Sequence, residues 1–76
     1  MTTQEIISAA TEIAEKMAAH NATNFGSIRA GIKAAEPIQA EILAILPETD
    51  NLQDDDYKTV RNLLKAQTGG NFIVNL

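Results

Sequence analysis

The sequence predicts an all-α fold, a small bundle of three to four short helices with an extended apolar C-terminal tail. Apolar residues recur at helical spacing in several windows of the 76-residue chain. The hydrophobic fraction is 45%, which is typical of a globular domain, and aromatic residues make up only 4%, so the core should be aliphatic. Pro37, Pro47 and the pair Gly69-Gly70 fall between or after these windows, where helices are expected to end.

A chain of this length supports one core, so we expect a single helical domain over residues 1–70. The first helix is predicted over residues 3–20. Thr2 and Glu5 have the spacing of a capping box, and the following apolar residues share one helical face. These are Ile6, Ala10, Ile13 and Met17. The second helix is predicted over residues 24–35, with Thr23 or Asn24 as its N-cap.

Pro37 is expected to end the second helix and to begin a third over residues 37–46, because proline suits the first helical position. A continuous helix with a kink is the alternative. The third helix is apolar nearly all round, so Leu43 lies on a face that a small monomer is not expected to cover. A loop over residues 47–54 leads to a fourth helix over residues 54–68, and Gly69 suits the position after its end.

The C-terminal sequence GGNFIVNL is unusually apolar for the end of a chain. Our first interpretation is that residues 71–76 form an extended tail that docks on the bundle as part of its core. The alternatives are an edge strand offered to a partner or a second copy, and a peptide substrate that follows the Gly69-Gly70 pair. The candidate residues for apolar contact or self-association are Leu43, Phe72, Ile73, Val74 and Leu76.

Negative charge is concentrated between residues 48 and 56, in a chain whose net charge is −4. The acidic residues there are Glu48, Asp50, Asp54, Asp55 and Asp56. No register of this segment supplies both the central Gly and the final Glu of an EF-hand loop, so no metal site is expected. The three consecutive aspartates suit a helix N-terminus. The cluster therefore predicts a helix start together with an acidic contact surface for a basic partner.

A stripe of basic residues, Lys58, Arg61 and Lys65, follows the acidic segment. Such a stripe could lie on a helix that reads DNA. However, the chain has a negative net charge, and the three aspartates occupy the helix end that phosphates prefer. Nucleic acid is therefore not the expected partner.

Catalytic residues are not expected. The chain has no Cys and one His, His20, whose place at the edge of an apolar stripe predicts a partly buried or helix-capping side chain. Ser8 and Ser27 have no recognisable nucleophile motif. The sequence indicates neither a cofactor, nor a signal peptide, nor a membrane span, and we expect a cytoplasmic location.

These observations predict a small non-catalytic intracellular interaction protein. We expect an inhibitor or regulator, of the kind encoded by phages or mobile elements, that binds a protein partner through acidic and residual apolar surface and that could also form a homo-oligomer. One alternative is the precursor of a ribosomally made modified peptide, with a helical leader and a C-terminal core after Gly69-Gly70. The other is a helical DNA-binding regulator that uses the basic stripe.

Overall fold

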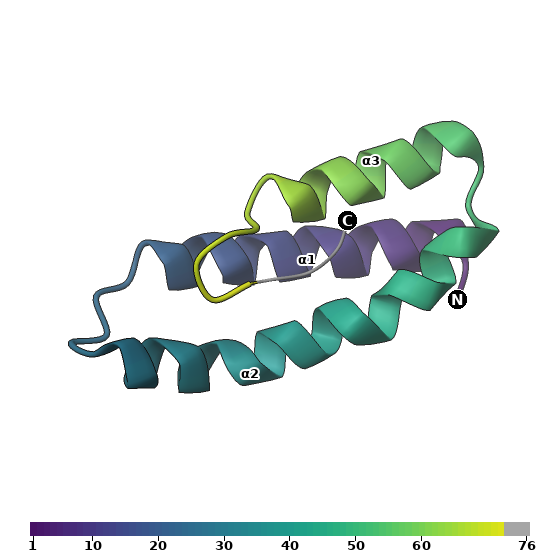
Figure 1. Ribbon diagram of the computed structural model, residues 1–76. Helices are drawn as coiled ribbons and strands as arrows, with labels where there is room; N and C mark the ends of the chain where they lie inside the picture. Colours follow the sequence, from purple (N-terminus) through teal and green to yellow (C-terminus); the bar gives the residue numbers. More distant parts are fainter. Residues whose placement is uncertain (73–76) are drawn as a thin grey trace.

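The computed structural model describes residues 1–72, and its helices are α1 (Thr3–Asn21), α2 (Ile28–Ile45), the 3-10 helix η1 (Leu46–Asn51) and α3 (Asp54–Lys65). α1 packs against both α2 and α3, whereas α2 and α3 make little contact with each other (Figure 1). The described part of the chain contains no strand. The predicted all-α bundle is therefore confirmed, with three α-helices in an elongated body of 41 × 19 × 17 Å.

α1 begins as the sequence predicts. The Thr2 hydroxyl accepts a hydrogen bond from the Glu5 N–H at 3.2 Å, and the Thr2 N–H donates to Glu5 Oε1 at 2.9 Å. This reciprocal pair satisfies two backbone donors at the helix start. The hydrogen bond from Thr2 holds the pKa of Glu5 below its ordinary value. The predicted apolar face of this helix is buried.

α2 starts later than predicted, at Ile28, and its N-cap is Ser27, whose hydroxyl accepts from the Ala30 N–H at 3.1 Å. Asn24 instead closes a tight turn by accepting from the Gly26 N–H at 3.0 Å. Gly26 has a φ of +79°, which is incompatible with a helix and easy for glycine alone. The prediction of a helix start at Thr23 or Asn24 was therefore wrong.

The predicted break at Pro37 is also wrong, because α2 continues through this residue to Ile45. Pro37 is exposed, so the backbone carbonyl of Lys33, which loses its usual helical donor, lies on the solvent side of the helix. Figure 1 shows α2 bending near its middle, as expected for a helix with an internal proline. The predicted helices 24–35 and 37–46 are thus one helix.

The predicted loop over residues 47–54 is largely helical. Pro47 lies at the start of η1, and Thr49 is fully buried there, with its hydroxyl donating to the Leu46 carbonyl at 2.6 Å. α3 then begins at Asp54 as predicted but ends at Lys65, three residues before the predicted end. The Ala66 N–H closes α3 on the Asn62 carbonyl at 3.1 Å.

The chain after α3 folds back in a tight turn over residues 69–72. Gly69 and Phe72 exchange backbone hydrogen bonds at 3.0 and 2.9 Å, and Gly70 between them has a φ of +55°. Glycine at this position suits a two-residue turn that needs a positive φ. Gly69 therefore belongs to the turn rather than to the helix cap. The predicted tail 71–76 begins inside this turn, and its last four residues lie outside the described residues.

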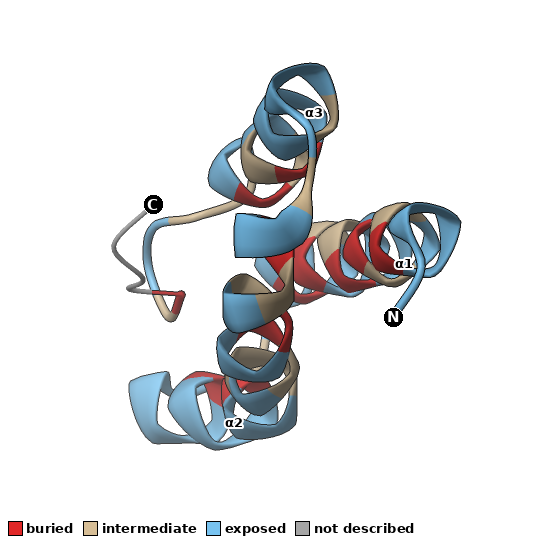
Figure 2. Cartoon of the chain, turned by 90° about the vertical axis from the view of Figure 1, so that its right-hand side faces the viewer, coloured by how far each residue is buried: buried red, intermediate tan, exposed pale blue. Residues whose placement is uncertain are grey.

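The core lies where the buried faces of the three helices converge (Figure 2). The fully or nearly fully buried apolar residues are Ile6, Ala10, Ile13, Met17, Ala35, Ile42, Ile45, Val60, Leu64 and Phe72. Eight are Ile, Leu, Val or Ala, which confirms the predicted aliphatic character of the core. Phe72 is its single aromatic member and has no exposed surface, so the start of the predicted tail does supply core.

Candidate functional site

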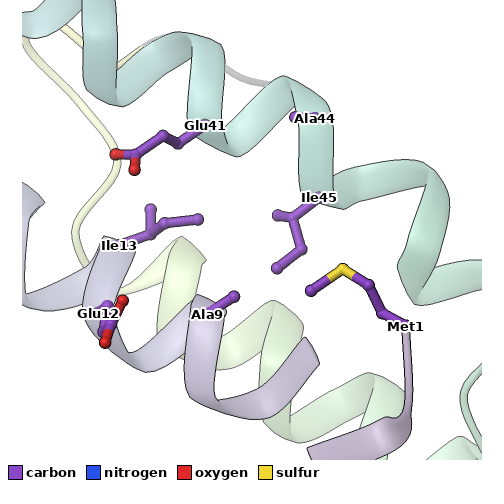
Figure 3. Close-up of a pocket in the computed structure, with 7 residues that line it drawn as sticks. All are labelled: Met1, Ala9, Glu12, Ile13, Glu41, Ala44 and Ile45. Atoms are coloured by element: carbon purple, nitrogen blue, oxygen red, sulfur yellow. The ribbon is translucent and has the colours of Figure 1, made fainter. Parts of the chain in front are cut away.

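A shallow apolar pocket opens between the first half of α1 and the end of α2 (Figure 3). Ile13 of α1 faces Ile45 of α2 across it, and the Met1 side chain approaches Ile45 at one end. The complete lining is Met1, Ala9, Glu12, Ile13, Glu41, Ala44 and Ile45. Its volume is ≈ 220 Å³, below the roughly 300–1,000 Å³ of small-molecule sites. The pocket is therefore smaller than a typical small-molecule site.

Two carboxylates lie on the rim of this pocket. Glu41 is paired with Lys16, whose Nζ lies 2.8 Å from Glu41 Oε1, and this hydrogen bond raises the pKa of Lys16. Glu12 and Lys16 have the i, i+4 spacing of a pair within α1, but the direct bond of Lys16 crosses to Glu41 of α2. Glu12 has no ion pair among the described residues and remains available on the rim.

The predicted acidic residues lie at the end of the molecule next to the pocket. Glu48 and Asp50 belong to η1, which directly follows the pocket residue Ile45, and the three consecutive aspartates form the first turn of α3. Asp50, Asp54 and Asp55 are exposed, and Asp56 is half-buried. None of these four aspartates has an ion pair within residues 1–72, whereas Glu48 lies 3.7 Å from the Met1 amino group. We call Glu48, Asp50, Asp54, Asp55 and Asp56 the acidic end.

The three residues of the predicted basic stripe differ in exposure. Lys58 and Lys65 are exposed, but Arg61 is half-buried. Its Nη2 donates to Thr49 Oγ1 at 3.3 Å, and its guanidinium lies over the ring of Tyr57, 4.8 Å from the ring centre. Arg61 therefore ties α3 to η1 and is not free to contact phosphate as an extended side chain.

His20 is buried, as its position at the edge of the apolar stripe predicts. Its ring lies 4.6 Å from the Phe25 ring and 4.9 Å from the Phe72 ring, measured between centroids. Asn71 Nδ2 donates to His20 Nε2 at 3.0 Å, so Nε2 is the accepting nitrogen of the ring. His20 thus anchors the C-terminal turn.

The hydroxyls of Ser8 and Ser27 both accept local hydrogen bonds. The Ser27 hydroxyl caps α2, and the Ser8 hydroxyl accepts from Gln4 Nε2 at 3.4 Å.

Among the described residues, no group of three or more His, Asp or Glu side chains is arranged to hold a metal ion. Every helix in residues 1–72 is too short or too polar to span a bilayer.

Leu43 is 57% exposed, as expected for a face with no neighbouring helix. Of the predicted apolar tail contacts, Phe72 is buried in the core. Ile73, Val74 and Leu76 lie outside the described residues.

The sequence did not predict the pocket or the hydrogen bond between Asn71 and His20, because no local pattern relates positions so far apart in the chain.

Comparison of the chain with protein-family models, with curated proteins and with solved structures finds no match.

Proposed function

We propose that this chain is a small, non-catalytic, cytoplasmic interaction protein that inhibits or regulates a protein partner by binding it. The observation that carries the proposal is an apolar pocket whose lining residue Met1 is ion-paired with Glu48 of the acidic end. A partner that fits this surface presents one apolar side chain surrounded by Lys or Arg. The apolar side chain enters the pocket between Ile13 and Ile45, and the basic residues approach the unpaired aspartates.

The chemistry of the surface supports such a division of roles. Contact with Met1, Ala9 and Ile45 removes apolar surface from water, which provides affinity. The carboxylates of the acidic end attract a basic partner at long range and disfavour acidic ones, which provides association rate and specificity. No pair between exposed charges contributes much affinity by itself, so both parts of the surface are needed.

The proposal can be tested by affinity capture from the native host followed by measurement with the purified partner. The charge variant is Asp50→Asn with Asp55→Asn, and its control is Glu15→Gln, an exposed acid of α1 away from the acidic end. The pocket variant is Ala44→Leu, which partly fills the pocket, and its control is Ala34→Leu, an exposed alanine of α2 outside the lining.

A genuine partner is retained by the wild type and both controls and is weakened by each test variant. Its affinity also falls with added salt, and the charge variant shows a smaller fall. If the test variants and the controls retain the same proteins equally, this surface is not the binding site and the proposal fails.

The two alternative functions have less support. A peptide precursor would have to expose the bond after Gly70, yet Phe72, two residues further on, is fully buried. An unchanged mass for the C-terminal residues after co-expression with the neighbouring genes would count against it. A DNA-binding regulator would need Arg61, which contacts Thr49 and Tyr57. Absence of any mobility shift with mixed DNA at low salt would exclude that role.

A further inference from the structure

α2 presents an apolar stripe that its own fold leaves uncovered. Ile28, Ile32 and Leu43 are 82%, 50% and 57% exposed, respectively. At 3.6 residues per turn, these residues and Gln39 fall on one narrow strip of the helix, beside the buried face. We call Ile28, Ile32, Gln39 and Leu43 the outer stripe. The chain is short and has no disulfide, and association is one way for such a small domain to cover apolar surface.

A groove lies along part of the outer stripe. A groove of ≈ 300 Å³ is lined by Ile32, Ala35, Glu36, Gln39, Ala40, Leu43 and the turn residue Asn71. Four of these residues, Glu36, Gln39, Ala40 and Leu43, have the i, i+3, i+4, i+7 spacing that forms a hole for a side chain of a facing helix. The small side chain of Ala40 leaves room in that hole.

We propose that a second copy of this chain occupies the groove, with the two α2 helices antiparallel about a two-fold axis near residues 35 and 36. In this register Ile28 faces Leu43 of the second copy, and Ile32 faces the hole formed by Glu36, Gln39, Ala40 and Leu43 of the second copy. The same contact repeats in the other direction, as an isologous interface requires. One surface thereby provides both the projecting side chain and the site that receives it.

The charges beside the outer stripe fit the same register. Lys33 and Glu36 lie on the solvent-side flank of the stripe, and neither has an ion pair among the described residues. In the antiparallel pair, Lys33 of each copy is offset from Glu36 of the other by two residue rises, about 3 Å, which is within reach of a lysine side chain. Two symmetric ion pairs therefore form.

The contact does not depend on the proposed function, because the outer stripe lies apart from the pocket between α1 and α2. Sedimentation of the purified full chain over a range of concentrations tests it directly. We expect a dimer whose dissociation constant rises at least about tenfold with Ile32→Glu, since the substituted residue occupies both holes. The matched control Ala30→Glu adds the same charge to an exposed position of α2 outside the stripe and should leave the dissociation constant unchanged.

A charge exchange tests the register. Lys33→Glu and Glu36→Lys each place like charges across the interface and should weaken their own homodimers. An equimolar mixture of the two variants should form a heterodimer, because both ion pairs are then restored. A monomeric wild type at all concentrations, a dimer that tolerates Ile32→Glu, or a mixture that forms no heterodimer would each overturn the proposal. If the monomer melts at a lower temperature with Ile32→Glu, the stripe is covered from within its own chain instead.

Discussion

The contact between Gly31 and the C-terminal turn leads to a quantitative prediction. Gly31 is buried inside α2, where alanine would favour the helix by about 1 kcal/mol. However, a Cβ atom at this position would lie 2.9 Å from Asn71 Nδ2, which is too close. The same nitrogen donates to His20 Nε2. Gly31→Ala should therefore displace the Asn71 amide and weaken that hydrogen bond.

We expect the cost of this displacement to match or exceed the gain in helix propensity. A buried acceptor left without its donor costs about 1–3 kcal/mol. Gly31→Ala should accordingly change the free energy of unfolding by between about 0 and −2 kcal/mol. When Asn71 has already been replaced by Ala, the obstructing atoms are gone, and the only other close atom, Phe25 Cδ2, lies at an ordinary 3.5 Å. In that background Gly31→Ala should stabilise the protein by about 1 kcal/mol.

Urea unfolding of the wild type, both single variants and the double variant, followed by far-ultraviolet circular dichroism, measures this coupling energy. We expect about 1–3 kcal/mol between Gly31 and Asn71. The control pairs Gly31→Ala with Asn51→Ala, an exposed residue of η1, and these two effects should add. If Gly31→Ala stabilises the wild type as much as it stabilises Asn71→Ala, the turn does not pack on α2 and the reasoning is refuted.

Three further predictions concern the core, the proline and the capping box. Phe72→Ala should lower the free energy of unfolding by about 3–5 kcal/mol, as measured by urea unfolding, and Phe72→Leu should lower it less; a negligible loss would mean that this side chain is not core. Pro37→Ala should raise the free energy of unfolding by about 1–3 kcal/mol, because it restores a backbone donor for the carbonyl of Lys33 in an otherwise continuous helix. A melting temperature below that of the wild type would contradict this expected stabilisation. The lowered pKa of Glu5 stabilises the fold above pH 4.5, and this contribution is lost as the pH falls through the folded-state pKa. The free energy of unfolding of Glu5→Gln should therefore depend less on pH below 4.5 than that of the wild type. If the two proteins lose stability equally between pH 4.5 and lower pH, the carboxylate has no such role.

Local signals predicted the start of α1 and the start of α3 correctly, because capping residues and a run of aspartates act within one helical turn. The start of α2 was misplaced because three nearby residues, Thr23, Asn24 and Ser27, can each cap a helix. The dipeptide Gly26-Ser27 was the better signal, since a glycine followed by a capping serine separates the turn from the helix.

Pro37 shows where local rules are insufficient. Proline disfavours a helix interior, yet the helix continues because Ala35 before Pro37 and Ile42 after it are both buried in the core. Tertiary packing outweighs the local cost there. The pocket and the contact of Asn71 with His20 depend on the docking of elements distant in the sequence, and periodicity cannot predict such contacts. The acidic end could be located from the sequence because consecutive charges remain neighbours in any fold.

The central position of α1 has a consequence for local unfolding. Since α2 and α3 each pack against α1 and make little contact with each other, either one can detach without breaking the interface of the other. Such partial openings cost less than global unfolding, and they expose amides to hydrogen exchange at different rates along the chain. The amides of α1 exchange only when both interfaces are lost. The slowest-exchanging amides should therefore map to α1, with α2 and α3 behaving as separate cooperative units.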